Sequence, residues 1–161
     1  MEGWIAHGAA FSHQPTFGDN IRARTSGYNK TSSGHQGSWW IGTYENRSKA
    51  DIPAGEVQGN TPTGSLLSSL IRITGPEATF LLGGGCGSKT VVYLVLDGIA
   101  RQFNDKSKCK EQMSRVTSRV FKDFVGRVGR IVLLDHDEGG HLNFDDFRGD
   151  FVCLGMIANK M

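Results

Sequence analysis

Apolar residues in the second half of the chain occur in short runs of strand length, and turn residues separate these runs. β-branched and aromatic residues fill the runs, while glycine, aspartate and asparagine stand between them, which is typical of strands joined by tight turns. No strand–helix–strand spacing is present, so the pattern favours an all-β sandwich or jelly roll of about seven or eight short strands over a parallel α/β sheet. The runs are 66–73, 79–82, 90–96, 99–103, 113–120 and 127–134.

The strongest local signal is the dipeptide Asp97-Gly98, which stands between two of these runs. A two-residue hairpin turn of this composition needs positive φ at both positions, and we predict a β-hairpin here. The run 113–120 is ambiguous, because Met113 and Val116 keep helical spacing whereas its β-branched residues favour a strand. We predict a strand followed by a short helical turn at 121–125.

Residues 1–60 differ in composition, being rich in glycine, serine, asparagine and threonine. This composition predicts long loops joining short strands. Lysine and arginine (18) barely exceed aspartate and glutamate (16) and form no block, so nucleic acid is not an expected partner. No apolar run approaches the ~20 residues that cross a bilayer, so no membrane insertion is expected. The first residues do not resemble a secretory signal, although glycosylation sequons at Asn29 and Asn46 suit a secreted chain.

Two of the three cysteines lie at equal distances from the Asp97-Gly98 turn. If the hairpin register continues outward, Cys86 and Cys109 face each other across the two strands, and a disulfide is geometrically plausible. The alternative is two free buried thiols, because the register can break in the glycines before Cys86. Cys153 is left over and is expected to be unpaired.

An acidic stretch at 135–146 has oxygen-bearing side chains and a glycine at several places of a calcium loop. It departs from an EF-hand, because the fifth place is glycine, the twelfth is aspartate, and the flanks read as strands. Three interpretations stay open: a calcium loop on a β-scaffold, a ligand-contacting loop, or a solvated acidic turn. The candidate metal ligands are Asp135, Asp137, Asp145 and Asp146.

Aromatic residues lie on both faces of the strand expected at 39–45. One of the two adjacent tryptophans is expected in the core and the other nearer the surface, where an aromatic ring can stack on a pyranose face. The alternative is that both are core residues, because large aromatic side chains dominate the interiors of β-sandwiches. We predict that sugar recognition uses Trp40 and Tyr44 for stacking, with Trp39 as the first alternative if Trp40 is core. The hydrogen-bonding partners in this prediction are Glu45, His141 and Asn143.

Several blocks, taken together and in order, carry a resemblance to a known family. They are WWIGTYE at 39–45, GEVQG at 55–59, PTGSLLS at 62–68, FLLGGGC at 80–86, LVLDG at 94–98, RIVLLD at 130–135 and GHLNFDDF at 140–147. The chain resembles the accessory module found beside invertase- and levanase-type glycoside hydrolases and in large secreted planctomycete proteins with cytochrome c-type domains.

The resemblance implies a jelly-roll sandwich of the galactose-binding kind, spanning residues 1–150 and followed by a divergent tail at 151–161. It also implies a role in carbohydrate binding. By analogy with such modules, Glu2 is a further candidate ligand for a structural calcium shared with Asp145 or Asp146. Family members carry a tryptophan before the Gly-His pair of the acidic stretch, where this chain has Gly139.

The function that fits these observations best is a non-catalytic, carbohydrate-binding-like accessory module of a larger extracellular protein, with calcium as its possible cofactor. The alternative is an adhesion or structural domain that binds a protein surface. An enzyme is the least expected class, because no serine or cysteine stands in the setting of a nucleophile elbow. The expected partners are therefore a glycan or a protein surface.

Overall fold

The computed structural model describes residues 3–21, 32–84, 89–103 and 110–154, and the regular secondary structure in these ranges is almost entirely β-strand. They contain no α-helix, only short 3₁₀ turns such as η1 (Ala9–Phe11) and η3 (Val120–Phe124). No helix within them is long and apolar enough to cross a membrane. The strands are β1 (Ile5–Gly8), β2 (Thr16–Phe17), β3 (Trp39–Gly42), β4 (Gly64–Leu67), β5 (Ile71–Gly84), β6 (Thr90–Leu96), β7 (Ile99–Gln102), β8 (Ser114–Ser118), β9 (Val128–Asp135) and β10 (Leu142–Cys153).

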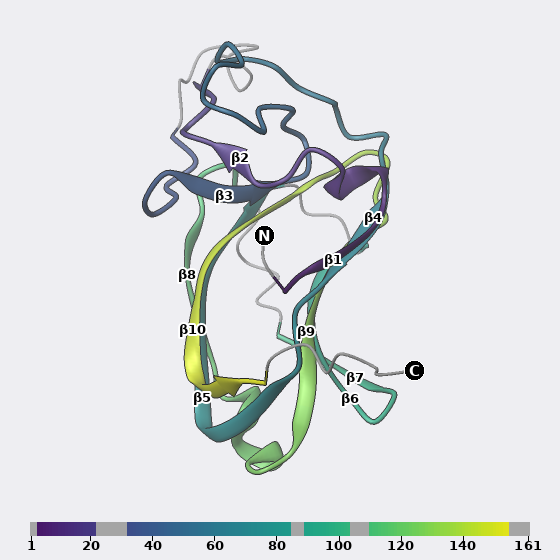
Figure 1. Ribbon diagram of the computed structural model, residues 1–161, viewed down its shortest axis with the longest axis vertical. Helices are drawn as coiled ribbons and strands as arrows, with labels where there is room; N and C mark the ends of the chain where they lie inside the picture. The colour runs from purple at the N-terminus through teal and green to yellow at the C-terminus, as the bar shows by residue number, and fades with distance from the viewer. Residues whose placement is uncertain (1–2, 22–31, 85–88, 104–109, 155–161) are drawn as a thin grey trace.

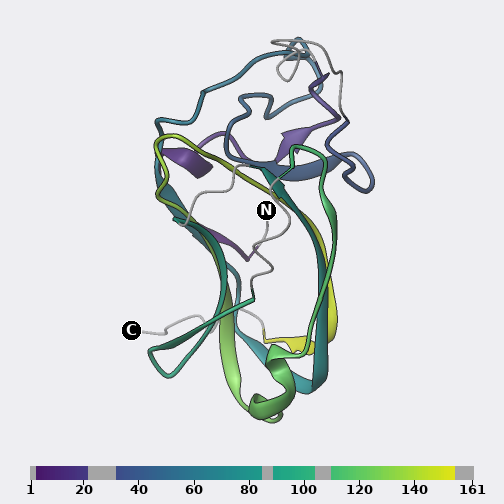
Figure 2. The ribbon, with the colours of Figure 1, turned by 180° about the vertical axis from the view of Figure 1, so that it is seen from behind.

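The strands form one curled antiparallel sheet whose two halves lie face to face (Figures 1 and 2). The first layer has the order β1-β4-β9-β6-β7, and the second has the order β2-β3-β10-β5-β8. The layers are joined where the start of β5 also pairs with the start of β9, at Ile71↔Gly129. The all-β sandwich predicted from the sequence is confirmed.

The core lies between the two layers and receives side chains from both. Leu133 and Leu94 come from the first layer, and Phe80 and Phe144 from the second, and all four are buried. Phe80 is the centre of an aromatic cluster, with ring centroids of Phe103, Phe144 and Phe147 between 5.5 and 5.9 Å away. Because large aromatic side chains bury the most apolar area, this cluster holds the layers together.

The strand β10 is irregular, and the irregularity determines which side chains face the core. Between Asp145 and Arg148 its register against β5 shifts by one residue, and Asp146 there has a φ of 49°. An extra residue of this kind is a β-bulge, which interrupts strict alternation of side chains. Phe144 and Phe147, three positions apart, therefore both contact the core.

The local sequence signals gave correct predictions. The hairpin of β6 and β7 closes with Leu96 opposite Ile99, and Asp97 and Gly98 both have positive φ. The strand followed by a helical turn is confirmed as β8 and η3. Short strands separated by loops are found in the first part of the chain, as β1, β2 and β3.

Two boundaries differ from the expectation. The run 66–73 is divided between the end of β4 and the start of β5, with residues 68–70 outside both strands. From Ile71, β5 continues to Gly84 through the run 79–82 and accommodates Gly75 in a second irregularity against β10. Glu77 there donates its backbone N–H to the Asp150 carboxylate at 3.0 Å. The tail expected from residue 151 begins inside β10, since Phe151 pairs with Ile73 and Cys153 with Ile71.

Candidate functional site

The two faces of β3 place its adjacent tryptophans in opposite environments. Ile41 lies opposite the core residue Phe144 of β10, so Ile41 and Trp39 share the side of the sheet that faces the other layer. Trp40 lies on the outer side. The exposed fraction is 44% for Trp39 and 2% for Trp40.

The burial of Trp40 corrects its assignment to sugar stacking. Its indole nitrogen donates to the Gly18 carbonyl at 2.7 Å. The His35 ring stacks on the Trp40 ring, with the ring centroids 6.0 Å apart. Together with Leu81 and Met113 it forms a second, smaller core on the outer side of the second layer. The ring is enclosed because loops cover this side of the sheet, which the alternation of residues in a single strand does not reveal.

Two of the other predicted ligand residues, Glu45 and Asn143, are also buried. Asn20 donates its side-chain amide to the Glu45 carboxylate and also to the Glu56 carbonyl. Asn143 donates to the Glu111 carbonyl at 3.0 Å, while its Oδ1 atom has no hydrogen-bond partner in the described part of the chain. The Asn143 side chain ties a loop to β10, the Glu45 side chain joins two loops, and both lie away from solvent.

Tyr44 and His141 are brought together by the structure, with ring centroids 5.3 Å apart. The His141 ring lies between the Asn60 Oδ1 atom, 3.0 Å from Nδ1, and the Glu111 carboxylate, 2.9 Å from Nε2. His141 is 8% exposed, and both of its ring nitrogens contact side chains of the same chain.

Asp135 is a buried carboxylate at the end of β9, with 1% of its surface exposed. The Thr43 hydroxyl donates to it, and the backbone N–H of Asp137 donates at 3.3 Å. Burial raises the pKa of Asp135 above its ordinary value, although both hydrogen bonds favour the ionised form. Thr43, the residue after β3, in turn accepts the backbone N–H of Leu142 at 2.8 Å and so links the end of β9 to the start of β10.

The remaining predicted metal ligands have separate partners. Asp137 accepts the backbone N–H of Gly139 at 3.1 Å and stabilises a local turn. Asp146 is bound by Arg115 and Arg148. Burial by itself raises the pKa of Asp146, but the hydrogen bonds from the two arginines outweigh it and hold the pKa below its ordinary value.

These carboxylates do not form one cluster. Within 3–21, 32–84, 89–103 and 110–154, no group of three or more histidine, cysteine, aspartate or glutamate side chains is placed to hold a metal ion. Calcium binding stays a prediction. Glu2, Cys86 and Cys109 lie outside the described residues, and so does the predicted disulfide, whereas Cys153 is free and exposed.

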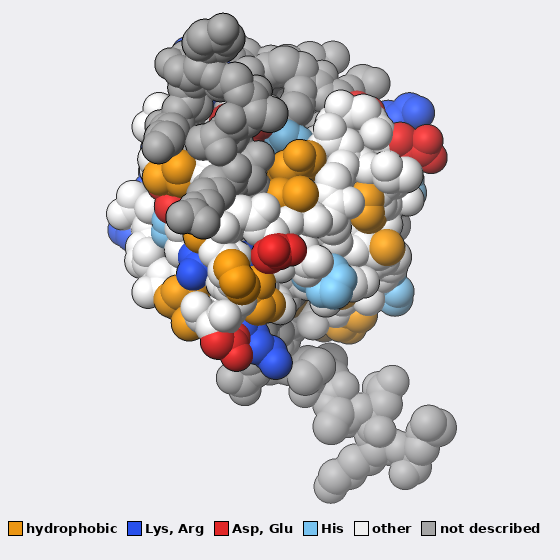
Figure 3. Space-filling view, turned by 90° about the horizontal axis from the view of Figure 1, so that it is seen from above, with side chains coloured by type: hydrophobic (Ala, Val, Ile, Leu, Met, Phe, Trp, Pro, Cys, Tyr) orange, Lys and Arg blue, Asp and Glu red, His pale blue; other side chains and the backbone are white. Residues whose placement is uncertain are grey.

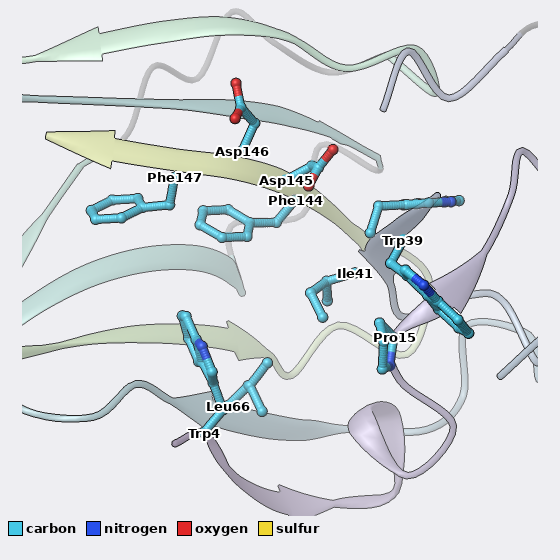
Figure 4. Close-up of a pocket in the computed structure, with 10 residues that line it drawn as sticks. Trp4, Pro15, Trp39, Ile41, Leu66, Phe144, Asp145, Asp146 and Phe147 are labelled. Atoms are coloured by element: carbon cyan, nitrogen blue, oxygen red, sulfur yellow. The ribbon is translucent and has the colours of Figure 1, made fainter. Parts of the chain in front are cut away.

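A cleft of about 360 Å³ opens between the two layers on the inner side of β3 (Figure 4). Trp4 and Leu66 form one wall, while Phe144 and Phe147 of β10 form the opposite wall. Trp39 lies at one end of the cleft, near Pro15. The remaining lining residues are Trp40, Ile41, Asp145 and Asp146.

The exposed ring of Trp39 is held in place from one side. Phe17 packs against it edge to face with ring centroids 4.9 Å apart, and the Arg47 guanidinium lies 5.2 Å above the Phe17 ring. Arg47 is itself fixed by donating to the carbonyls of Ile52 and Phe17. Since each partner is anchored, the indole forms a supported platform next to the cleft.

Asp145 is a partly buried carboxylate that borders this end of the cleft, and it points to the side of β10 opposite Phe144 (Figure 4). Its Oδ2 atom accepts the backbone N–H of Gln36 at 2.6 Å. Burial raises its pKa, against the lowering effect of the N–H groups of Gln36 and Asp146. An ionised carboxylate offers about four acceptor positions, so Asp145 has capacity left for a further donor.

A second cavity of about 230 Å³ shares Trp4 and Phe147 with the first and continues toward Phe151. Ser68, Ser69, Ile71, Ile131 and Cys153 complete its lining. The aromatic residues of β10 thus border both cavities. From above, hydrophobic side chains of the described residues lie in small groups separated by polar ones (Figure 3).

The contact most similar to a catalytic pair is between Ser33 and His35, whose Oγ and Nδ1 atoms are 2.6 Å apart. Ser33 is fully buried, and its hydroxyl donates to the Asp19 carboxylate at 2.8 Å. Because a hydroxyl has one proton, His35 is the donor in the second contact, which does not activate the serine. The hydrogen bonds of Ser33 and His35 therefore stabilise the local structure and do not create a nucleophile.

Comparison with solved structures shows what the fold is. The structure matches the carbohydrate-binding module TmCBM61, solved in complex with β-1,4-galactotriose, with a TM-score of 0.56 at 14% identity over 95% of this chain and 90% of that chain. The two chains share a fold. CBM35 from Cellvibrio japonicus Abf62 matches with a TM-score of only 0.36, at 13% identity over 94% of this chain and 99% of that one.

No protein-family model matches the sequence, and no curated protein matches it. The specific resemblance to the module of invertase- and levanase-type hydrolases therefore stays a prediction. Sequence reasoning missed the cleft residues Trp4, Pro15 and Phe147. A signal for Phe147 was present, since Phe144, Phe147 and Phe151 break the two-residue alternation of a regular strand.

Proposed function

We propose that this chain is a non-catalytic carbohydrate-binding module whose sugar site is the Trp39 end of the cleft. The observation that carries the proposal is the supported indole of Trp39, 44% exposed beside a cleft that Asp145 also lines. A pyranose presents C–H groups on its faces and hydroxyls around its edge. An indole face suits the first, and a carboxylate acceptor suits the second.

The shared fold supports this proposal. TmCBM61 was solved in complex with β-1,4-galactotriose, which makes β-1,4-linked galactose oligomers the first ligands to examine. The proposed module acts within a larger extracellular protein, as an accessory that brings its partner domains to a glycan. One stacked ring contributes about 1 kcal/mol beyond the buried area, so a single module binds weakly and depends on avidity.

The decisive experiment is glycan binding by the wild type and by Trp39→Ala. We expect measurable binding of at least one oligosaccharide on a glycan array, followed by calorimetry with β-1,4-galactotriose among the candidates. Trp39→Ala should weaken that binding on the order of tenfold or more, since an exposed platform is lost without a change of fold. The matched control is Ile99→Ala, which truncates another exposed hydrophobic residue, 51% exposed in β7.

The proposal is wrong if the wild type binds no glycan on the array. It is also wrong in its choice of site if Trp39→Ala and Ile99→Ala bind the same glycan as tightly as the wild type. Thermal melting of both variants shows that each is folded before the affinities are compared.

A further inference from the structure

The cleft behind Trp39 differs in chemistry from its rim. Apart from the two aspartates, its lining consists of tryptophan, proline, isoleucine, leucine and phenylalanine side chains. Asp146 and Phe147 point to opposite sides of β10 (Figure 4), and Asp146 is already paired with Arg115 and Arg148. The interior of the cleft therefore offers apolar surface and few hydrogen-bonding groups.

A sugar ring is a poor occupant for this interior. Its hydroxyls would leave water and meet the side chains of Leu66, Phe144 and Phe147, which have no donors or acceptors. An apolar group has no such penalty and gains free energy in proportion to the apolar area that it buries. The volume of about 360 Å³ is also within the range of small-molecule sites.

The second cavity extends the apolar path. It shares Trp4 and Phe147 with the first, and it is bordered by Phe151, seven residues along β10 from Phe144. At about 3.3 Å per residue, this stretch of strand measures roughly 23 Å. The path is long enough for an aromatic ring or an alkyl chain of several carbons.

We propose that the module recognises glycosides that carry an apolar aglycone, with the sugar on Trp39 and the aglycone in the cleft between Trp4 and Phe147. This inference rests on the proposed function, because it places the sugar at the same rim. It adds the ligand class: an amphipathic glycoside is preferred over the free sugar.

The test compares matched probes that differ only in the aglycone. Methyl β-D-galactopyranoside and phenyl β-D-galactopyranoside are titrated into the protein by calorimetry, and the same pair of glucosides is titrated in parallel. We expect the phenyl glycoside to bind on the order of tenfold more tightly than the methyl glycoside, from the apolar area of one ring. The fluorescence of Trp4, which lines both cavities, should change with the phenyl glycoside.

A charged side chain in the cleft should remove this preference. In Trp4→Glu, the phenyl glycoside should bind no more tightly than the methyl glycoside, because the aglycone would meet a carboxylate. Ile99→Glu adds the same charge at a distant exposed position and should keep the preference. Trp4→Ser is the second variant if Trp4→Glu does not fold, and it should reduce the ratio of the two affinities.

The possible results separate this inference from the proposed function. Equal binding of both glycosides, lost in Trp39→Ala, overturns the aglycone site and leaves the sugar site standing. A phenyl preference that persists unchanged in a folded Trp4 variant also overturns it, because the aglycone then lies elsewhere. If no glycoside and no glycan on the array binds, the proposed function is wrong and the inference fails with it.

Discussion

The two faces of β3 differ in how completely their side chains are packed and hydrogen-bonded by other residues of the chain. On the outer face, Trp40 is covered by loops and donates to a backbone carbonyl, and nearby Glu45 accepts from Asn20. On the inner face, Trp39 is 44% exposed and packs against Phe17. Groups whose contacts are complete within the chain stabilise it, whereas a supported but exposed ring is available to a partner.

The largest expected effect separates the two tryptophans by stability. Trp40→Ala should lower the free energy of unfolding by about 3 to 5 kcal/mol, since it leaves a cavity next to Leu81 and Met113. Trp39→Ala should lower it by less than about 1 kcal/mol, as is usual for exposed positions. Urea denaturation followed by circular dichroism measures both values.

Equal destabilisation by the two substitutions would contradict the comparison. Trp40→Phe serves as a control, because it keeps most of the packing and loses only the hydrogen bond to Gly18. Its cost should be clearly smaller than that of Trp40→Ala.

A smaller effect tests the polar contacts at the end of the packed face. Thr43→Val keeps the shape of the side chain but removes the hydroxyl that donates to Asp135 and accepts from Leu142. The free energy of unfolding should fall by about 2 to 3 kcal/mol, because two buried groups lose a partner. Thr43→Ser keeps the hydroxyl and should cost less in the same denaturation experiment; a Val variant as stable as the Ser variant would show that the hydroxyl contributes nothing.

The smallest expected effect concerns pH and has opposite signs at two carboxylates. The pKa of Asp146 is lowered, so its contribution to stability is present above the ordinary value of 3.8 and is lost as the pH falls through the folded-state pKa. Asp146→Asn should therefore cost about 1 kcal/mol or less at neutral pH, because its arginine partners are partly solvated, and nothing in strong acid.

At Asp135 the pKa is raised, so the sign is reversed. Its ionisation costs stability, and this cost appears as the pH rises from 3.8 through the raised folded-state pKa. The stability of Asp135→Asn relative to the wild type should therefore increase with rising pH, whereas that of Asp146→Asn should decrease. Denaturation curves at several pH values measure both slopes, with Asp51→Asn as an exposed control; slopes of the same sign would contradict the assignment.

The sequence predicted those features that depend on neighbouring residues. The Asp97-Gly98 turn sets its own hairpin, because the required positive φ values are a property of those two residues. It also predicted that one tryptophan of the pair at 39–40 is buried, because adjacent strand residues face opposite sides. It could not choose between them, since the choice depends on Ile41 lying opposite Phe144, about a hundred positions away.

The candidate site was harder to predict for the same reason. The carboxylates at 135–146 are close in sequence and suggested one loop, but Asp135 ends β9 and Asp146 lies within β10. Their partners are distant in sequence, since Thr43 donates a hydrogen bond to Asp135 and Arg115 forms an ion pair with Asp146. The cleft combines Trp4, just before β1, with Leu66 of β4 and Phe147 of β10. The spacing of residues within one segment cannot predict such a combination.

The extra residue at Asp146 changes which sequence positions of β10 face the core. Upstream of it, even positions carry the core side chains, as at Leu142 and Phe144; downstream, the core positions become odd, as at Phe147 and Phe151. If β10 kept the regular alternation of its upstream part with the sequence unchanged, Phe147 would point to the outer face. Both walls of the cleft would still be encoded, but one of them would lie on the wrong side of the sheet. The bulge, as much as residue identity, therefore places Phe147 in the cleft.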